Sequence, residues 1–129
     1  MLIKAQIALE SAFNATATKP NLKCGGTDDG LMQLNPKCNN VNSSLIFDPA
    51  YNIYWGVKYW SDDYYFLLQK WGDSCNTTLV LKATLELYNV GATAIGNNCG
   101  SFPLGTNYTS LVMKYYVPFS KNASYTPTL

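Results

Sequence analysis

Residues 48–71 read DPAYNIYWGVKYWSDDYYFLLQKW, and this stretch decides the fold class. Asp48 followed by Pro49 is typical of a helix start, because aspartate caps a helix N-terminus and proline fits its first position. Gly56 indicates close packing against another backbone. Apolar residues recur at helical spacing, namely Ile53, Val57, Trp60, Tyr64, Leu67 or Leu68, and Trp71. The stretch therefore predicts one long helix.

Further helices are expected on both sides of this one. The apolar spacing predicts helices over residues 2–13, from a Thr77 or Thr78 cap to Gly91, and over about 106–116. Residues 14–47 are rich in Gly, Asn, Asp, Thr and Pro and predict a long irregular segment, which in a compact domain is usually functional. We expect a mainly α fold with a catalytic domain over 1–116 and a C-terminal tail over 117–129.

The charge balance excludes several classes of partner. The 129 residues are 47% hydrophobic and carry nine Lys against eight acids, so no basic field gathers nucleic acid. No apolar run approaches the roughly 20 residues that span a bilayer, so we expect a soluble domain, most simply a monomer. Residues 1–9 lack the charged region and cleavage site of a signal peptide. Either a signal has been removed or the domain belongs to a longer chain.

Histidine is absent from the sequence. This excludes Ser-His-Asp and Cys-His nucleophilic schemes and zinc sites with imidazole ligands, and we expect neither a metal nor a cofactor. Acid–base chemistry then falls to carboxylates, Tyr, Lys or Cys. Only two glutamates occur, Glu10 and Glu86.

The four cysteines form an even set without a CxxC motif, which favours disulfides over a metal or redox site. Of three connectivities, the sequential one, Cys24–Cys38 with Cys75–Cys99, is favoured because each bridge closes a short loop. Asn-x-Ser/Thr sequons occur at Asn14, Asn42, Asn76, Asn107 and Asn122. They are typical of a secreted glycoprotein, although an Asn- and Thr-rich chain also produces them by chance. Cysteines and sequons together predict an oxidising, extracellular location.

Glu10 stands out on the first predicted helix. Ile3, Ile7 and Glu10 fall at i, i+4 and i+7, on one helical face. A glutamate on an apolar stripe has two explanations. A partner such as Lys4 or a backbone amide satisfies it, or desolvation raises its pKa so that it holds a proton near neutral pH.

Four segments of the chain follow one another in a characteristic order: Glu10-Ser11-Ala12-Phe13-Asn14, Gly30-Leu31-Met32-Gln33, Asp48-Pro49 with Asn52-Ile53, Gly56 and Tyr59, and Leu87-Tyr88-Asn89-Val90-Gly91. With them the chain resembles the lysozyme-like superfamily, specifically the soluble lytic transglycosylases and goose-type lysozymes. The matching motifs there are ES-x-F-N, GLMQ, DP-x-x-NI-x-x-G-x-x-Y and AYNAG. Tyr108 and Val112 fit the terminal Y-V-x-x-V helix less closely. The resemblance covers about residues 2–116.

The resemblance implies a helical lysozyme-like fold with a groove for a glycan strand. Glu10 is then the catalytic acid, which protonates the glycosidic oxygen. Ser11, Met32 and Gln33 are implied to line the groove near the cleaved bond. Tyr88 and Asn89 are implied to lie across it, and Tyr108 is a further candidate for substrate binding.

Four positions depart from the family pattern. Asn35 stands where goose-type hydrolases carry an Asp that positions water. Asp28 and Asp29, just before Gly30, are either a displaced water-activating pair or solvated turn residues. Glu86 is either a partnered helix residue or a second acid in the groove. The cysteine-bridged insertion around Thr27 is also atypical and points to a changed substrate preference.

The leading hypothesis is an enzyme that cleaves the β-1,4 bond between N-acetylmuramic acid and N-acetylglucosamine in peptidoglycan. It acts as a lytic transglycosylase or as a lysozyme, and the sequence leaves this choice open. The alternatives are a chitin-cleaving enzyme of the same fold and a non-catalytic glycan-binding module. Scarce carboxylates favour the transglycosylase, because a hydroxyl or acetamido group of the substrate replaces the second carboxylate of most glycosidases.

Overall fold

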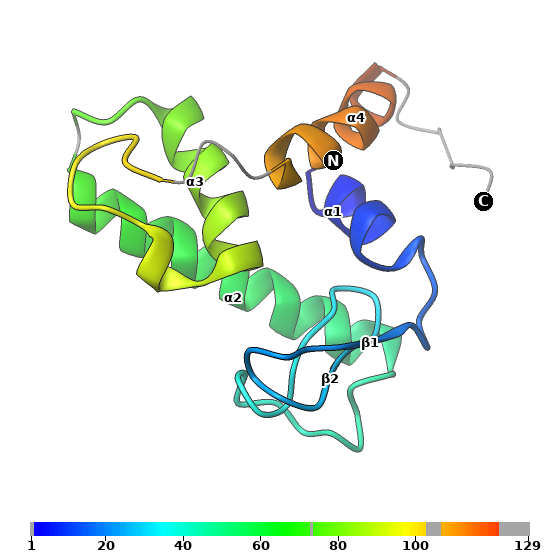
Figure 1. The fold of residues 1–129 in the computed structure, drawn as a ribbon. Helices are drawn as coiled ribbons and strands as arrows, with labels where there is room; N and C mark the ends of the chain where they lie inside the picture. Colours follow the sequence, from blue (N-terminus) through cyan, green and yellow to red (C-terminus); the bar gives the residue numbers. More distant parts are fainter. Residues whose placement is uncertain (1, 73, 103–106, 122–129) are drawn as a thin grey trace. The chain divides into compact units, whose positions relative to one another are not determined.

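The computed structural model describes residues 2–72, 74–102 and 107–121. Over these residues the chain is mainly helical, as the sequence predicts (Figure 1). The α-helices are α1 (Leu2–Ser11), α2 (Pro49–Trp71), α3 (Thr77–Val90) and α4 (Tyr108–Lys121), with a short 3-10 helix, η1 (Ala92–Ala94). Two short strands, β1 (Thr18–Pro20) and β2 (Thr27–Asp29), form an antiparallel pair.

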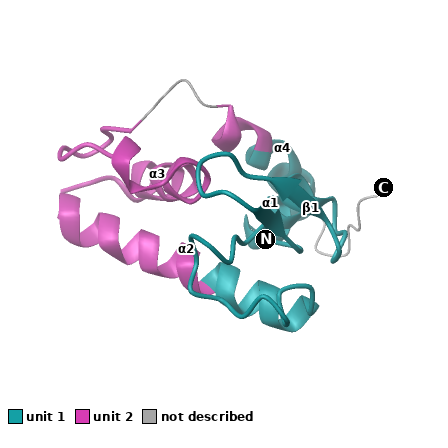
Figure 2. Cartoon of the chain, turned by 60° about the horizontal axis from the view of Figure 1, so that its bottom comes forward, with its two compact units in different colours: residues 1–57, 112–129 teal, residues 58–111 magenta. Residues whose placement is uncertain are grey.

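The chain divides into two compact units, which are coloured separately in Figure 2. Unit 1 comprises residues 1–57 and 112–129, and unit 2 comprises residues 58–111. Helices α2 and α4 each contribute residues to both units.

In unit 1, α1 buries a face made mostly of small residues, including Ala5, Ala8 and Ser11. Ile7 is buried as the helical spacing predicts, but Ile3 and Glu10 are only half-buried at the edge of this face. Small residues at i, i+3 and i+6 leave room for a neighbouring backbone to approach the helix. The face of α1 is therefore centred one position away from the predicted stripe.

The α2 helix begins at Pro49, as predicted, and the backbone N–H of Tyr51 donates to the Asp48 carboxylate at 2.7 Å. Its buried residues in unit 1 are Asn52 and Gly56 rather than Ile53 and Val57, of which Val57 is exposed. These two positions are buried because the loop of residues 30–33 packs against them. Leu67 and Trp71 lie on the predicted stripe and are buried.

Residues 14–47 are mostly irregular, but they contain the β1–β2 hairpin, which the sequence did not predict. The strands pair Thr18 with Asp29 and Pro20 with Thr27. Strands of three residues with no apolar alternation give no periodic signal.

The α4 helix extends beyond the predicted end at residue 116 and continues through Pro118 to Lys121. The boundary expected at residue 117 therefore falls inside a helix; residues 122–129 of the expected tail lie outside the described residues. Phe119 is fully buried, with its ring 6.4 Å from that of Phe13 and the Lys4 ammonium 4.9 Å from its centroid. Packing of this one large side chain favours the helix although Pro118 lacks a backbone N–H.

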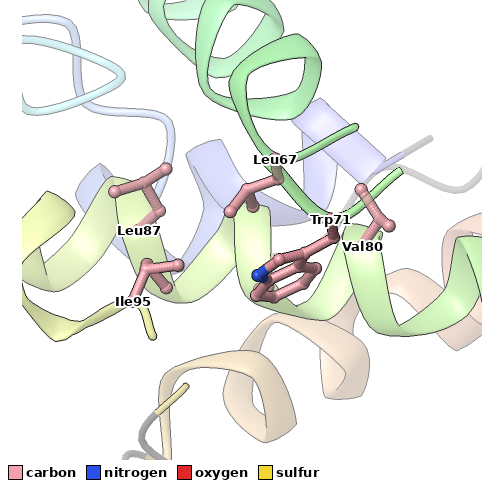
Figure 3. Close-up of a cluster of buried hydrophobic side chains, with 6 residues drawn as sticks. Leu67, Trp71, Val80, Leu87 and Ile95 are labelled. Carbon is pink, nitrogen blue, oxygen red and sulfur yellow. The ribbon is translucent and has the colours of Figure 1, made fainter. Parts of the chain in front are cut away.

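Unit 2 has its own hydrophobic core between α2, α3 and the residues that follow η1 (Figure 3). It comprises Leu67, Trp71, Val80, Ala83, Leu87 and Ile95. The cap of α3 is Asn76, whose side chain accepts from the N–H of Thr78, rather than the predicted threonine.

Both predicted disulfides are present, Cys24–Cys38 in unit 1 and Cys75–Cys99 in unit 2. Four sequon asparagines, Asn14, Asn42, Asn76 and Asn107, are exposed or partly exposed, and Asn122 lies outside the described residues. No described helix has the length and apolar character of a membrane span.

Candidate active site

Glu10 lies in the last turn of α1, next to Ser11, the residue that ends the helix. The Ser11 side chain is buried, and its hydroxyl lies 3.1 Å from the Ile7 carbonyl oxygen and 2.9 Å from that of Leu31. The two following residues, Ala12 and Phe13, have positive φ values of 50° and 62°. Non-glycine residues rarely adopt this conformation, so the turn after Glu10 is held by its surroundings.

The Leu31 carbonyl belongs to the 30–33 loop, Gly30-Leu31-Met32-Gln33. Its ends are closed by paired backbone hydrogen bonds between Asp29 and Leu34, at 2.8 and 3.0 Å. Gly30 has φ of 79°, and a Cβ on it would lie 2.8 Å from the Ile46 carbonyl oxygen. Glycine is required there by conformation and by space alike.

Asn52 of α2 holds the same loop through its side-chain amide. The side chain is fully buried, and its Oδ1 accepts from the Met32 N–H at 2.7 Å. Its Nδ2 donates to the carbonyl oxygens of Asp29 at 3.0 Å and of Ile46 at 2.8 Å. One amide thus satisfies three backbone groups of an irregular segment, which explains its burial.

Met32 and Gln33 have different surroundings. Met32 is fully buried, and its Cβ would lie 2.7 Å from a Cβ placed on Gly56, so it packs directly against the glycine. Gln33 is half-buried with φ of 51°, and its Nε2 donates to the carbonyl oxygens of Gly30 and Ala17. Of these two predicted groove residues, Met32 supports the loop from inside and Gln33 lies at its surface.

The carboxylates of Asp28 and Asp29 are both engaged by donors of unit 1. Asp29 is buried and accepts from the hydroxyls of Thr18 at 2.6 Å and Thr27 at 3.1 Å. Asp28 accepts from the side-chain amides of Asn21 and Asn35. Both residues belong to strand β2 rather than to a solvated turn, and their role as a water-activating pair stays a prediction.

Asn35 is itself part of this network. Its Nδ2 donates to Asp28 at 2.9 Å and to the Gly25 carbonyl oxygen at 3.1 Å, and its Oδ1 accepts from the Lys37 N–H at 2.9 Å. Both amide hydrogens and the oxygen are therefore used to hold the cysteine-bridged insertion.

The remaining predicted site residues belong to unit 2. Glu86 is buried, and its Oε1 accepts from the Thr109 hydroxyl at 2.6 Å and from the Thr109 N–H at 3.1 Å. Thr109 is in the first turn of α4, where backbone N–H groups favour an acidic partner. Tyr88 is half-buried and Asn89 exposed at the end of α3, and Tyr108 is buried at the start of α4. That Tyr88 and Asn89 lie across a groove from Glu10 stays a prediction.

A family model described as the transglycosylase SLT domain matches residues 1–107. The chain belongs to this family. No curated protein and no solved structure gives a significant match.

For this SLT domain, the family supports in general a peptidoglycan glycosidase of the lytic transglycosylase type. The mainly helical structure agrees with the lysozyme-like fold of the family. Its two disulfides favour an extracellular or periplasmic location. Three motif segments that carry the resemblance meet in unit 1: the Ser11 hydroxyl, the 30–33 loop and Asn52 of α2 are joined by direct hydrogen bonds.

One acid of the SLT domain, Asp63 of α2, was not predicted as a site residue from the sequence. Burial, and secondly the neighbouring charge of Asp62, raises the pKa of Asp63 to about 7. The signal was present in the sequence, because Asp63 falls on the same helical line as Gly56 and Leu67. No group of three His, Cys, Asp or Glu that could hold a metal occurs within residues 2–72, 74–102 and 107–121.

Proposed function

We propose that the protein is a lytic transglycosylase that cleaves the β-1,4 bond between N-acetylmuramic acid and N-acetylglucosamine, with Glu10 as its acid and base. The observation that carries the proposal is the hydrogen bond from the Ser11 hydroxyl to the Leu31 carbonyl oxygen. It joins the turn that bears Glu10 to the loop that bears Gln33. Two motifs that lie 20 residues apart in the chain thereby share one support.

The reaction needs only one carboxyl group from the protein. Glu10 donates its proton to the glycosidic oxygen as the bond to C1 breaks, and positive charge develops on the sugar ring. The Glu10 carboxylate then takes the proton of the 6-hydroxyl of muramic acid while that oxygen bonds to C1. The product is a 1,6-anhydro sugar, and the proton on Glu10 is restored.

The hydrogen bonds of Asp28, Asp29 and Asn35 favour this route over hydrolysis. A hydrolase needs a second group that activates or positions water. In this chain the acids beside the 30–33 loop accept from threonine hydroxyls and asparagine amides, and Asn35 replaces the expected aspartate. Glu86 is engaged by Thr109. These partners support a role for all four in the protein frame.

For the rest of the site we propose that Gln33 contacts the sugar next to the cleaved bond, supported by Ser11 and Met32. Tyr88, Asn89 and Tyr108 are also proposed to bind the glycan. The same proposal includes secretion, with glycans attached at the exposed sequons.

The test is the Glu10→Gln variant, compared with wild type in the clearing of bacterial cell-wall suspensions. We expect clearing to fall at least about 100-fold, as for loss of a general acid, with little change in melting temperature. Glu86→Gln is the matched control and should retain clearing. If Glu10→Gln clears walls at the parental rate, Glu10 is not the acid. Binding without cleavage by wild type would instead indicate a glycan-binding module, and cleavage of chitin alone would identify the other substrate.

A further inference from the structure

The tip of the β1–β2 hairpin, residues 21–26, exposes an aliphatic side chain completely. Leu22 has 99% of its surface accessible, more than the other large apolar side chains of the described residues. A single exposed leucine on a flexible loop needs no explanation. Leu22 differs from that case, because hydrogen bonds and a disulfide hold the tip in one conformation.

Asn21, the residue before Leu22, provides most of the bracing. Its Oδ1 accepts from the backbone N–H groups of Lys23 at 2.9 Å and Cys24 at 3.0 Å, which closes a turn around Leu22. Its Nδ2 donates to both oxygens of Asp28, and its backbone N–H donates to Gly26. The Cys24–Cys38 disulfide ties the other side of the tip to the chain beyond the 30–33 loop. The leucine is thus held out in water by a preorganised turn.

The tip also carries positive charge. Lys19, Lys23 and Lys37 are exposed, and the Lys37 side chain lies along Gly25 and Gly26, within 3.4 Å of where a Cβ on Gly26 would be. The two acids of this segment, Asp28 and Asp29, accept hydrogen bonds from neighbouring side chains. Three exposed ammonium groups against two carboxylates, of which that of Asp29 is buried, give the tip a net positive charge around one aliphatic group.

The base of the hairpin accepts a hydrogen bond from the Gln33 side chain. Ala17, directly before β1, accepts from the Gly30 N–H at 2.8 Å and from the Gln33 amide at 3.2 Å. Strands of three residues rise about 10 Å from this base. The tip therefore lies about 10 Å along the hairpin from the backbone group that anchors Gln33, a predicted groove residue.

We propose that the hairpin tip, through Leu22 and Lys37, binds the peptide stems that peptidoglycan carries on its muramic acid. This rests on the proposed function and names the part of the substrate that the insertion recognises. Stem peptides combine alanine methyl groups with free carboxylates, which complement an aliphatic side chain flanked by ammonium groups. A bare glycan strand such as chitin offers neither.

An anionic bilayer is the other surface with both features, and the structure favours it less. A whole myristoyl chain gives only marginal, reversible membrane binding, and the tip offers one leucine. Its lysines add attraction that salt weakens. The tip suits a small, spatially fixed group better than it suits a bilayer.

The experiment measures binding of soluble peptidoglycan strands with intact stems, and of the same strands after an amidase has removed the stems. The Glu10→Gln background keeps the strands intact during titration. We expect stem-bearing strands to bind about 10-fold more tightly, and Leu22→Ala or Lys37→Gln to reduce this ratio to about 2-fold. Leu45→Ala, which truncates another exposed leucine of unit 1, is the matched control and should keep the ratio at about 10-fold.

Two results of the strand titrations overturn the inference. One is a ratio near 1 in the parent, and the other is a ratio that Leu22→Ala and Leu45→Ala change equally. A vesicle experiment gives a third overturning result, in favour of a bilayer. In this result the protein sediments with phosphatidylglycerol vesicles at about 0.15 M salt, and Leu22→Ala abolishes the sedimentation while the strand ratio stays unchanged. Failure of the proposed function is read separately, as wild-type protein that cleaves neither type of strand.

Discussion

Replacing Asn35 with aspartate introduces the residue that the goose-type hydrolases carry. From the structure we predict that this replacement lowers the free energy of unfolding. The Asn35 amide donates to the Asp28 carboxylate at 2.9 Å and to the Gly25 carbonyl oxygen at 3.1 Å. In Asn35→Asp an oxygen faces both acceptors. Two hydrogen bonds become two repulsive contacts, one of them between carboxylates.

The magnitude follows from these distances. Loss of a hydrogen bond to a charged acceptor costs about 1.5–3 kcal/mol. Two charges at 2.9 Å repel by about 6 kcal/mol at an effective dielectric constant of about 20, an upper limit because the pair relaxes or keeps a proton. We expect a net loss of about 3–4 kcal/mol in the free energy of unfolding near pH 7.

The effect depends on pH with a definite sign. Repulsion between the introduced carboxylate and that of Asp28 raises the pKa of this pair in the folded state above the unfolded value of about 3.9. The folded protein then binds more protons than the unfolded one above that pH, so stability falls as pH rises. Near pH 4 the two carboxyl groups share a proton that restores one hydrogen bond, and the loss shrinks to about 1 kcal/mol.

Urea unfolding of wild type, Asn35→Asp and Asn35→Ala at pH 4.5 and 7.5 measures this. Asn35→Ala loses the same hydrogen bonds without adding charge, so its loss should vary little with pH. If Asn35→Asp is as stable as wild type at pH 7.5, the amide does not bridge these groups. A product one water heavier from that variant would contradict our account of Asn35 directly.

Three other variants test separate contacts. Asp63→Asn should raise the free energy of unfolding by about 1–2 kcal/mol at pH 8 and by little at pH 4. Burial raises the pKa of the Asp63 carboxyl in the folded state, so wild-type stability falls as pH rises from about 4 to 7, and the replacement removes this loss. The full shift is discounted because the carboxyl is only partly buried, and urea titrations across this pH range measure the effect. Gly56→Ala should lower the melting temperature through a loss of about 2–3 kcal/mol, because its Cβ would lie 2.7 Å from that of Met32; an unchanged calorimetric midpoint would refute the packing. Glu86→Ala should cost about 2–3 kcal/mol by leaving the Thr109 donors unpaired, whereas Glu86→Gln keeps an acceptor and should cost about 1 kcal/mol, so equal losses in chemical unfolding would contradict the contact.

Much of the fold was predictable because its signals are local. Asp48-Pro49 marks the start of α2, and cysteine spacing indicated both disulfides. What the sequence could not show depends on tertiary contacts. Nothing near Pro118 indicates a continuing helix, and the burial of Phe119 accounts for it. The β1–β2 hairpin has no strand pattern in its sequence, and the hydrogen bond from Thr18 to Asp29 that joins its strands depends on the tertiary fold.

For the candidate site, the sequence predicted which segments form it but not how they are joined. The motifs predicted that Glu10 and Gln33 belong to one site, and Ser11 supplies a physical link between their segments. The sequence did not show that Asn52 holds the 30–33 loop, because a buried amide and an exposed one look alike in a helix. The sequence also left the role of Asp28 open, because its partner Asn21 lies seven residues earlier and comes close only when the hairpin forms.

We propose that Glu10 acts without a second carboxylate and that the 6-hydroxyl oxygen of muramic acid bonds to C1 of the same sugar. Mass spectrometry of the soluble products from purified peptidoglycan tests this most directly, with wild type and Glu10→Gln digested side by side. We predict muropeptides that are one water lighter than hydrolytic products, formed by wild type and absent with Glu10→Gln. Products of full hydrolytic mass from wild type, or anhydro products from Glu10→Gln, would contradict it.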